Sequence, residues 1–282
     1  MKGIWLRLTL FLSLSTGYFS KAADPIKIDG SNGARPIVQA LATGFSETPD
    51  SPEIKVGTGM STTERIEALA ADSIQIASAS HGIEPERTEP HQLDVFQIGR
   101  MAVVFAVHET VRINNLSTES LLSLFSGKIT NWSTLGGPDL PVVLLMRPED
   151  EVDTEVVRAS IKGMANLAWA SSIRIYSKSG DLADALNATP GAIGITSSVR
   201  LVENKHISAI SIDGIPPGES EIRSGTYRLS RGIYLLTQRK PKTEVTNFLN
   251  FTDCSAGMEI LKSMHCIPTG LIKVSPGDEP HQ

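Results

Sequence analysis

The stretch that decides the fold is residues 121–164, LLSLFSGKITNWSTLGGPDLPVVLLMRPEDEVDTEVVRASIKGM. Leu140 to Met146 is an apolar run rich in valine and leucine, the pattern of a strand buried on both faces in a parallel sheet. Arg147 ends the run, and apolar residues recur at helical spacing from about Asp153. In open α/β sheets, ligands bind outside the carboxyl ends of strands, where the next helix presents amides to an anion. The sequence therefore predicts an α/β fold with a candidate ligand loop after Arg147.

This stretch resembles the phosphate-binding protein family of the phosphate ABC importer, which carries a phrase close to FSGKITNW, then GGPDLP, a strand and an arginine. Two further matches follow in the family's order, TPGAIGI at 189–195 and TYRLSRGIYLLT at 226–237. The similarity therefore spans nearly the whole mature chain. It implies a two-lobe α/β fold of the periplasmic-binding-protein type (type II), with a ligand cleft between the lobes.

Residues 1–22 have the features of a secretory signal peptide. Lys2 and Arg7 supply positive charge, Leu8 to Leu14 form an apolar core, and Ser20 to Ala22 form a small-x-small cleavage site. A membrane anchor would need about 20 apolar residues, and this run is shorter. No cysteine follows the core, so lipid anchoring is not indicated. We therefore expect a periplasmic or secreted protein.

The composition favours a globular, acidic protein. The chain has 282 residues, 40% apolar and 20% charged, which is enough for one large domain or two smaller ones with cores of their own. Removing residues 1–22 removes three positive charges and no negative ones, so the formal charge moves from −5 to −8. That charge argues against a nucleic-acid partner.

Strand, turn and helix alternate at both ends of the chain, which favours a lobe built from both ends. The apolar strand 98–107 is the candidate for the first crossing between lobes, and the turn-rich segment 216–225 is the candidate for the return. A helix is expected around Met164 to Ala170. The predicted organisation is a signal peptide at 1–22, lobe I at 23–107 and 223–282, and lobe II at 108–222.

Two cysteines, Cys254 and Cys266, flank a short helical pattern. Because an oxidising compartment is expected, a disulfide between them is the natural interpretation. It would contribute about 3 kcal/mol at most in the chain-entropy model. The alternative is a pair of free buried thiols.

No catalytic or metal-binding motif is present in the sequence. The six histidines show neither metal-ligand spacing nor an HExxH pair, and the chain lacks a GxSxG elbow, a phosphate-loop lysine motif and CxxC. We therefore expect no enzyme activity, no metal and no cofactor. His81 follows a strand end, and it is either a ligand contact or an ordinary hydrogen-bonded histidine.

Two glycine-containing turns, GSNGAR at 30–35 and GMSTTER at 59–65, lie where helices are expected to begin. Such turns can present several amide donors to an anion. The alternative is ordinary helix capping by Ser31, Asn32, Ser61 and Thr62.

The family resemblance implies which residues hold the anion. In the family, backbone and hydroxyl donors hold the anion. By alignment they correspond to positions in the two turns, at the end of a strand and at the arginine within 121–164: Ala34, Arg35, Thr62, Ser80 and Arg147.

The turn after Arg147 departs from the family, which has a small neutral turn there. Without a gap, Glu151 and Asp153 replace its serine and threonine, whereas one inserted residue would restore Thr154 to its place. Glu149 could accept the proton of a monohydrogen phosphate. Further acids facing the ligand would repel it by about 4 kcal/mol at about 4 Å, or about three decades of affinity. They could instead face solvent, cap the helix or pair with Arg147.

These observations predict an exported solute-binding protein that binds a small oxyanion, phosphate first, for ABC-type import. Its expected partners are that ligand and the membrane permease of an ABC importer, and the chain is expected to be a monomer. The alternative is a family member that kept the scaffold, lost tight phosphate binding and serves as a sensor or interaction protein.

Overall fold

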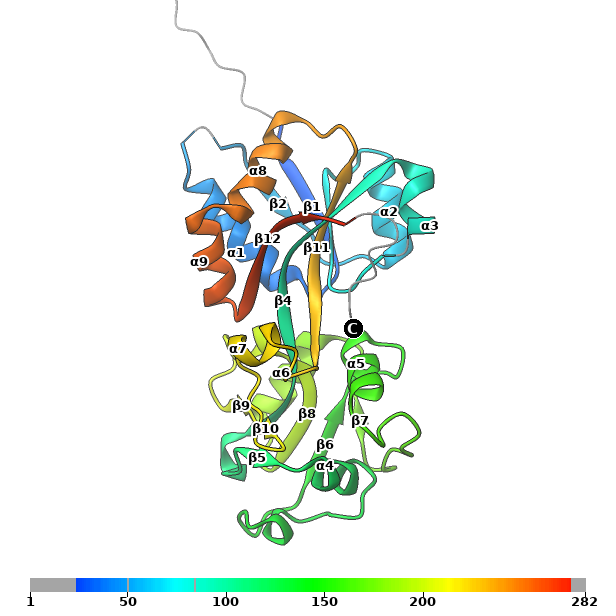
Figure 1. Ribbon diagram of the computed structural model, residues 1–282, viewed down its shortest axis with the longest axis vertical. Helices are drawn as coiled ribbons and strands as arrows, with labels where there is room; N and C mark the ends of the chain where they lie inside the picture. The colour runs from blue at the N-terminus through cyan, green and yellow to red at the C-terminus, as the bar shows by residue number, and fades with distance from the viewer. Residues whose placement is uncertain (1–23, 50, 84, 275–282) are drawn as a thin grey trace, which may run out of the picture.

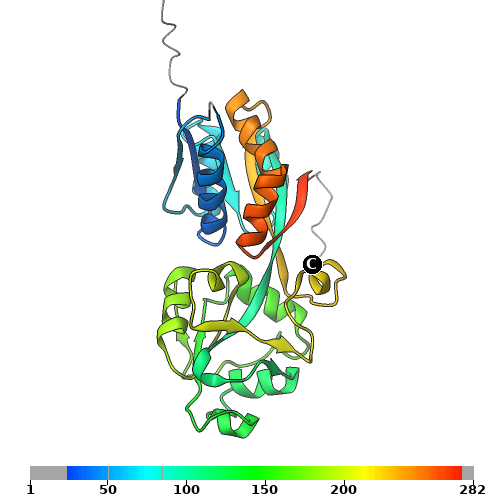
Figure 2. The same cartoon turned by 90° about the vertical axis from the view of Figure 1, so that its left-hand side faces the viewer.

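The structure is a computed structural model that describes residues 24–49, 51–83 and 85–274. Two α/β lobes lie one above the other, connected by the long strands β4 (Leu93–His108) and β11 (Ser230–Gln238) (Figure 1). The view from the side shows the narrow waist that these strands cross (Figure 2). The predicted two-lobe α/β fold class is confirmed, while the signal peptide expected at 1–22 lies outside the described residues.

The upper lobe is a sheet covered by helices on both faces. Ile37, Leu41 and Phe45 of α1 recur every four residues and are buried against one face together with residues of α8 and α9. Ile66 and Leu69 of α2 are buried against the other face. The remaining elements here are β1 (Ile26–Gly30), α1 (Arg35–Ser46), β2 (Ile54–Val56), α2 (Thr62–Ala70), β3 (Ile76–Ala79), α3 (Pro85–Thr88), α8 (Thr243–Asp253), α9 (Ser255–Ser263) and β12 (Cys266–Lys273).

The lower lobe has one large hydrophobic core in which Phe105 of β4, Phe125 of α4 and Trp132 are completely buried. The Trp132 indole donates to the Gly191 carbonyl at 2.9 Å, so its polar edge is satisfied. The elements are β5 (Asn115–Leu116), α4 (Thr118–Phe125), β6 (Val143–Met146), α5 (Val152–Ser160), β7 (Arg174–Ile175), α6 (Ser179–Ala188), β8 (Ala192–Ser197), β9 (Ile207–Ala209), β10 (Ser211–Ile212) and α7 (Glu219–Arg223).

Strand β4 belongs to both lobes, so ten strands of the described chain form one sheet: eight follow one another in the order β2-β1-β3-β11-β4-β8-β6-β7, and β9 and β12 pair with β4 beside that path. Its first part pairs with β11 and β12, and residues from Val103 onward pair with β8 and β9. Strands β1 and β3 run in the same direction as β4, toward the lower lobe, because β11 is antiparallel to both β3 and β4. Strands β6 and β8 run against β4. The carboxyl ends of the parallel strands of both lobes therefore face each other.

The prediction of a helix around Met164 to Ala170 is wrong, because this segment forms turns and irregular chain. Arg158 of α5 explains the difference. Its guanidinium lies 3.9 Å from the centre of the Trp169 ring and also donates to the backbone carbonyl oxygens of Met164 and Leu167. These two carbonyl oxygens thus accept hydrogen bonds from the Arg158 side chain, whereas in a helix they would accept them from backbone amides.

The predicted disulfide is also contradicted, because Cys254 and Cys266 are both free. They lie at opposite ends of α9, whose nine residues span about 13 Å at 1.5 Å per residue. A disulfide needs Cα atoms about 4.4–6.8 Å apart. Cys254 is exposed, whereas Cys266 is buried beside Gly99, and burial raises the pKa of its thiol to about 12.

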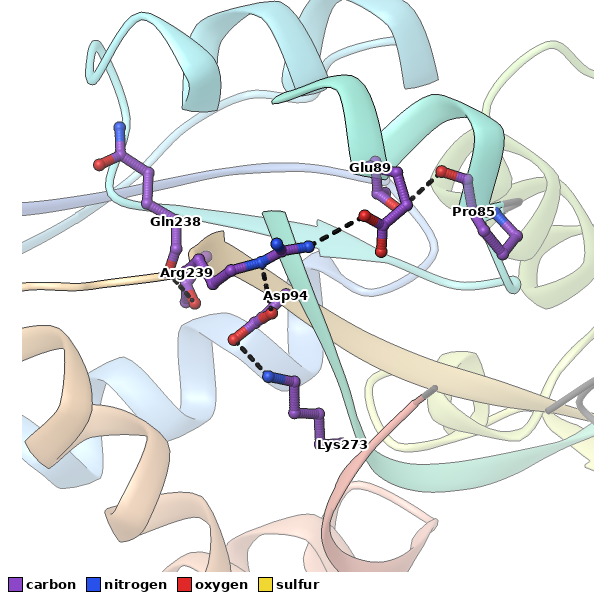
Figure 3. A network of polar contacts seen from close by, with 8 residues as sticks. Pro85, Glu89, Asp94, Gln238, Arg239 and Lys273 are labelled. Atoms are coloured by element: carbon purple, nitrogen blue, oxygen red, sulfur yellow. Dashed lines mark hydrogen bonds and ion pairs between the residues drawn. The ribbon is translucent and has the colours of Figure 1, made fainter. Parts of the chain in front are cut away.

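A charged network closes the end of the upper sheet that lies away from the lower lobe (Figure 3). Arg239 contacts Glu89 at 3.0 Å and Asp94 at 3.7 Å, and Lys273 contacts Asp94 at 2.7 Å. Two cations thus meet two acids, and the network ties the ends of β11 and β12 to the start of β4. Within the ranges described, no helix is long and apolar enough to cross a membrane.

Candidate functional site

The candidate site lies where the strand ends of the two lobes meet. We call the upper-lobe side, built by the loops after β1 and β3, the upper face. The lower face is built by the ends of β6 and β8 and the start of α5. Parallel strand ends of this kind are where α/β proteins bind ligands.

The upper face is made of small groups that are already bonded to one another. The Ser31 and Ser80 hydroxyls are 2.7 Å apart, and the Gly33 amide donates to Ser31 at 3.2 Å. Ser80 and Ala34 are buried. The N-cap of α1 is Ala34, so neither Ser31 nor Asn32 caps this helix with its side chain.

Two residues carried over from the family lie at the margin of this face. Arg35 is exposed and, together with Arg200, lines a groove of about 610 Å³ beside α1. Thr62 accepts a 2.6 Å hydrogen bond from the buried Arg65, which also donates to the Ser78 carbonyl. At the second turn, ordinary capping is correct, because Ser61 forms a capping box with Glu64.

The lower face carries buried polar atoms that have no partner among the described residues. They are Arg147 Nε, Thr154 Oγ1, Thr196 Oγ1, Ser197 Oγ and Arg200 Nε. Continuing the parallel register of Leu145 with Gly194 sets Arg147 beside Thr196 at the ends of β6 and β8. We call these five residues the anion cluster. Leaving one buried polar group unsatisfied costs about 1–3 kcal/mol, so a group of them indicates a place for a ligand.

Two arginines that the sequence analysis did not select connect the two faces. Arg231 Nε donates to Asp153 Oδ1 at 2.6 Å, and its Nη1 donates to the Ser80 carbonyl at 2.9 Å. Arg200 Nη2 donates to the Ser179 hydroxyl at 2.7 Å and to the Asn32 carbonyl at 3.0 Å. Burial lowers the pKa of Arg200. Each arginine therefore reaches from one lobe to the other.

Both could have been found from their sequence positions. Arg231 lies within the family phrase TYRLSRGIYLLT, and Arg200 follows the strand that begins in TPGAIGI. Neither position is marked by composition or periodicity. Thr196 and Ser197 could have been selected more simply, because they are the polar residues at the end of the strand that begins in TPGAIGI. Arg147 stands in the same way at the end of the apolar run from Leu140 to Met146.

Three acids of the turn after Arg147 each pair with a different arginine. Glu151 pairs with Arg147, and Asp153 is buried with Arg231. Glu149 instead pairs with Arg158 at 2.7 Å and accepts a bond from the Trp169 indole.

These positions correct the suggestion that Glu149 accepts a ligand proton, because its carboxylate is held on the outer side of α5. The hydrogen bond from Arg158 lowers the pKa of Glu149, with a smaller contribution from Trp169. Thr154 lies in the first turn of α5 and is buried, and whether the inserted-residue alignment is the right one stays a prediction.

The charge of the site is positive. Arg147 and Arg231 are buried, and Asp153 is the one acidic residue that is buried among the described residues. Arg200 adds a third positive charge beside Asp153 and Arg231. Glu151 is 41% exposed, so water screens its charge more than that of Asp153. The arrangement suits a small anion that accepts several hydrogen bonds. No group of three or more residues able to hold a metal ion occurs in the part of the chain described.

Known proteins share both the sequence and the shape of this chain. A family model described as a PBP superfamily domain matches residues 19–254. The chain is 30% identical over 237 residues to the phosphate-binding protein PstS of Bacillus subtilis (strain 168), covering 82% of this chain and 76% of the relative. It is 23% identical over 268 residues to PstS of Borreliella burgdorferi, covering 90% and 95%.

Solved structures share the fold. A protein from Clostridium perfringens, whose structure contains bound phosphate, superposes with a TM-score of 0.72 at 21% identity, covering 89% of this chain and 100% of its own. An ABC-type phosphate transport receptor from Vibrio cholerae superposes with a TM-score of 0.61 at 21% identity, covering 86% and 99%.

Proposed function

Because the chain belongs to the family of phosphate-binding proteins, we propose that it binds inorganic phosphate between its lobes and delivers it to an ABC-type importer. The observation that carries this proposal is the anion cluster. Its unpartnered atoms lie in a site where buried positive charge exceeds buried negative charge. Phosphate is compact, carries one or two negative charges near neutral pH and accepts hydrogen bonds on every oxygen.

Asp153 supports phosphate over sulfate as the ligand. Its Oδ1 is bonded to Arg231, and the carboxylate can accept a further hydrogen bond. Monohydrogen phosphate has a proton to donate, whereas sulfate does not and would place an unprotonated oxygen against the acid. Arsenate shares the proton and should follow phosphate.

The protein acts after export, with residues 1–22 removed as a signal peptide, and meets the membrane permease of an importer as a monomer. It performs no catalysis. The alternative of a scaffold without tight phosphate binding is not favoured. Glu151 and Asp153 each have an arginine partner, and the donors of the lower face have none within the described ranges.

The test is calorimetric titration with phosphate, sulfate and arsenate, using neighbouring serines as a matched pair. Ser197 is buried and its hydroxyl has no partner among the described residues, whereas Ser198, also buried, already donates to the His265 carbonyl at 2.9 Å. Ser197→Ala should weaken phosphate binding, and Ser198→Ala should leave the affinity unchanged. The proposal fails if wild type binds none of the three anions, or if the two variants behave alike.

A further inference from the structure

A second pocket, of about 230 Å³, lies between the two lobes on the other side of the Arg231–Asp153 pair. We call it the hinge pocket. Its lower wall is α5, which in Figure 1 lies directly beneath the upper lobe beside β11. Its upper wall includes Arg100 and Tyr234, and Arg228 and Ser230 line it where the chain crosses between lobes. None of the residues of the anion cluster lines it.

The lower wall of the hinge pocket is apolar. Val152, Val156 and Ala159 recur along α5 at spacings of four and three residues, so they share one side of the helix. None of the three is buried, although each lines the pocket. The helix therefore presents an apolar stripe to a space that no other part of the described chain fills.

The upper wall combines an aromatic ring with positive charge. The Tyr234 ring lies against Gly232, where a Cβ would come within 2.4 Å of it, so glycine is needed for the ring to take this position. Arg100 donates to the Ser230 hydroxyl at 2.9 Å. Among the described residues, neither Arg100 nor Arg228 has an acidic partner within 4.0 Å, and both guanidinium groups keep donors available.

Glu155 is the one carboxylate among the described residues that line the pocket, and burial, with help from Asp150 and Glu151, raises its pKa. It is exposed and forms no ion pair with Arg100 or Arg228. Two cations and one acid thus line the pocket beside an apolar wall. The volume of the pocket equals the share of about seven or eight water molecules, which is room for a small molecule.

We propose that the hinge pocket binds a small organic anion, with its acidic group on Arg100 and Arg228 and its aromatic or short aliphatic body on the apolar stripe of α5. Inorganic phosphate does not meet this description, because it has no apolar part to cover Val152, Val156 and Ala159. The site is separate from the proposed phosphate site, and both are occupied together. Because its walls come from both lobes, its ligand contacts the two lobes at once.

Benzoate is a suitable probe, and benzyl alcohol is its neutral counterpart. Titration of wild type in saturating phosphate should show saturable binding of one benzoate per chain and none of benzyl alcohol. Arg228→Gln and Arg100→Gln should each weaken benzoate binding at least tenfold, and Ala159→Trp should abolish it by filling the pocket. Arg174→Gln and Ala165→Trp change exposed residues elsewhere in the lower lobe and are the controls.

Phosphate affinity should be unchanged in all of these variants, which also shows that they are folded. The inference is overturned if benzoate does not bind, if it competes with phosphate, or if the pocket variants bind it as the controls do. A titration with benzoate in the absence of phosphate tests the hinge pocket independently of the proposed phosphate site. Benzoate should bind there even if the anion cluster does not bind phosphate.

Discussion

On the upper face the Ser80 hydroxyl is bonded to Ser31 and its carbonyl to Arg231, whereas on the lower face the buried hydroxyls of Thr154, Thr196 and Ser197 have no partner in the part of the chain that the structure describes. The upper face thus holds a hydroxyl that is already hydrogen-bonded, and the lower face holds hydroxyls that are not. A paired hydroxyl must exchange one bond for another when a ligand arrives, so it gains little. An unpaired one gains a bond that it lacked, so ligand affinity should depend mainly on the lower face.

The largest effect is expected from Arg147→Ala on the lower face. Truncating one member of a buried charged pair costs about 2–5 kcal/mol, so phosphate affinity should fall by about 30-fold or more. Calorimetric titration measures it, with Arg174→Ala, an exposed arginine of the same lobe, as the control. Equal affinity in the two variants would contradict the importance given to the lower face.

The acidic turn should give the next largest effect. Glu151→Ser with Asp153→Thr should tighten sulfate binding by relieving repulsion, and Asp153 should supply most of that gain because it is buried while Glu151 is partly exposed. Since each acid already has an arginine partner, we expect about tenfold, or about 1.4 kcal/mol, rather than three decades.

In this double variant the affinity for sulfate should rise more than the affinity for phosphate, because phosphate alone loses Asp153 as the acceptor of its proton. The loss of phosphate affinity with rising salt should become steeper in the variant, because its site is more positive and salt screens the attraction for the anion; titration at several ionic strengths will show this. An unchanged affinity would mean that Asp153 does not face the ligand.

A smaller effect is expected on the upper face. Ser80→Ala removes a hydroxyl that is already bonded to Ser31, so it should weaken phosphate binding by less than about tenfold, the equivalent of one ordinary hydrogen bond. Thr196→Val, on the lower face, is the matched comparison and should cost more. If Ser80→Ala is the more damaging of the two, the contrast between the faces is wrong.

No effect on affinity is expected at Cys254, which is exposed at the start of α9. Cys254→Ser and added reductant should leave phosphate binding and stability unchanged, since no disulfide exists to lose. In the native protein a thiol reagent should modify Cys254 quickly and Cys266 only after unfolding, because Cys266 is buried and its pKa is raised to about 12. An unfolded, unreduced sample with no reactive thiol would contradict the structure.

The sequence by itself determined the fold class and the general place of the site. Apolar runs that end in polar loops identify buried strands, and the carboxyl ends of such strands are ligand edges for a topological reason that needs no coordinates. Arg147 and Ser80 were found in this way or through the family phrases. The lobe boundaries at 107 and 222 and the contacts to the ligand stay predictions.

Only the tertiary structure decided where each charge goes. Glu151 pairs with Arg147, four residues before it, which is one of the outcomes that the sequence left open. No local rule assigns Glu149 to Arg158 or Asp153 to Arg231, because these partners lie nine and 78 residues away along the chain. The same reason explains the two errors. Arg158 took the carbonyls of the expected helix, and the length of α9 separated two cysteines that are close in sequence. Periodicity reports which face of an element is buried, whereas ion pairs depend on distances between elements, which are set only when the lobes pack.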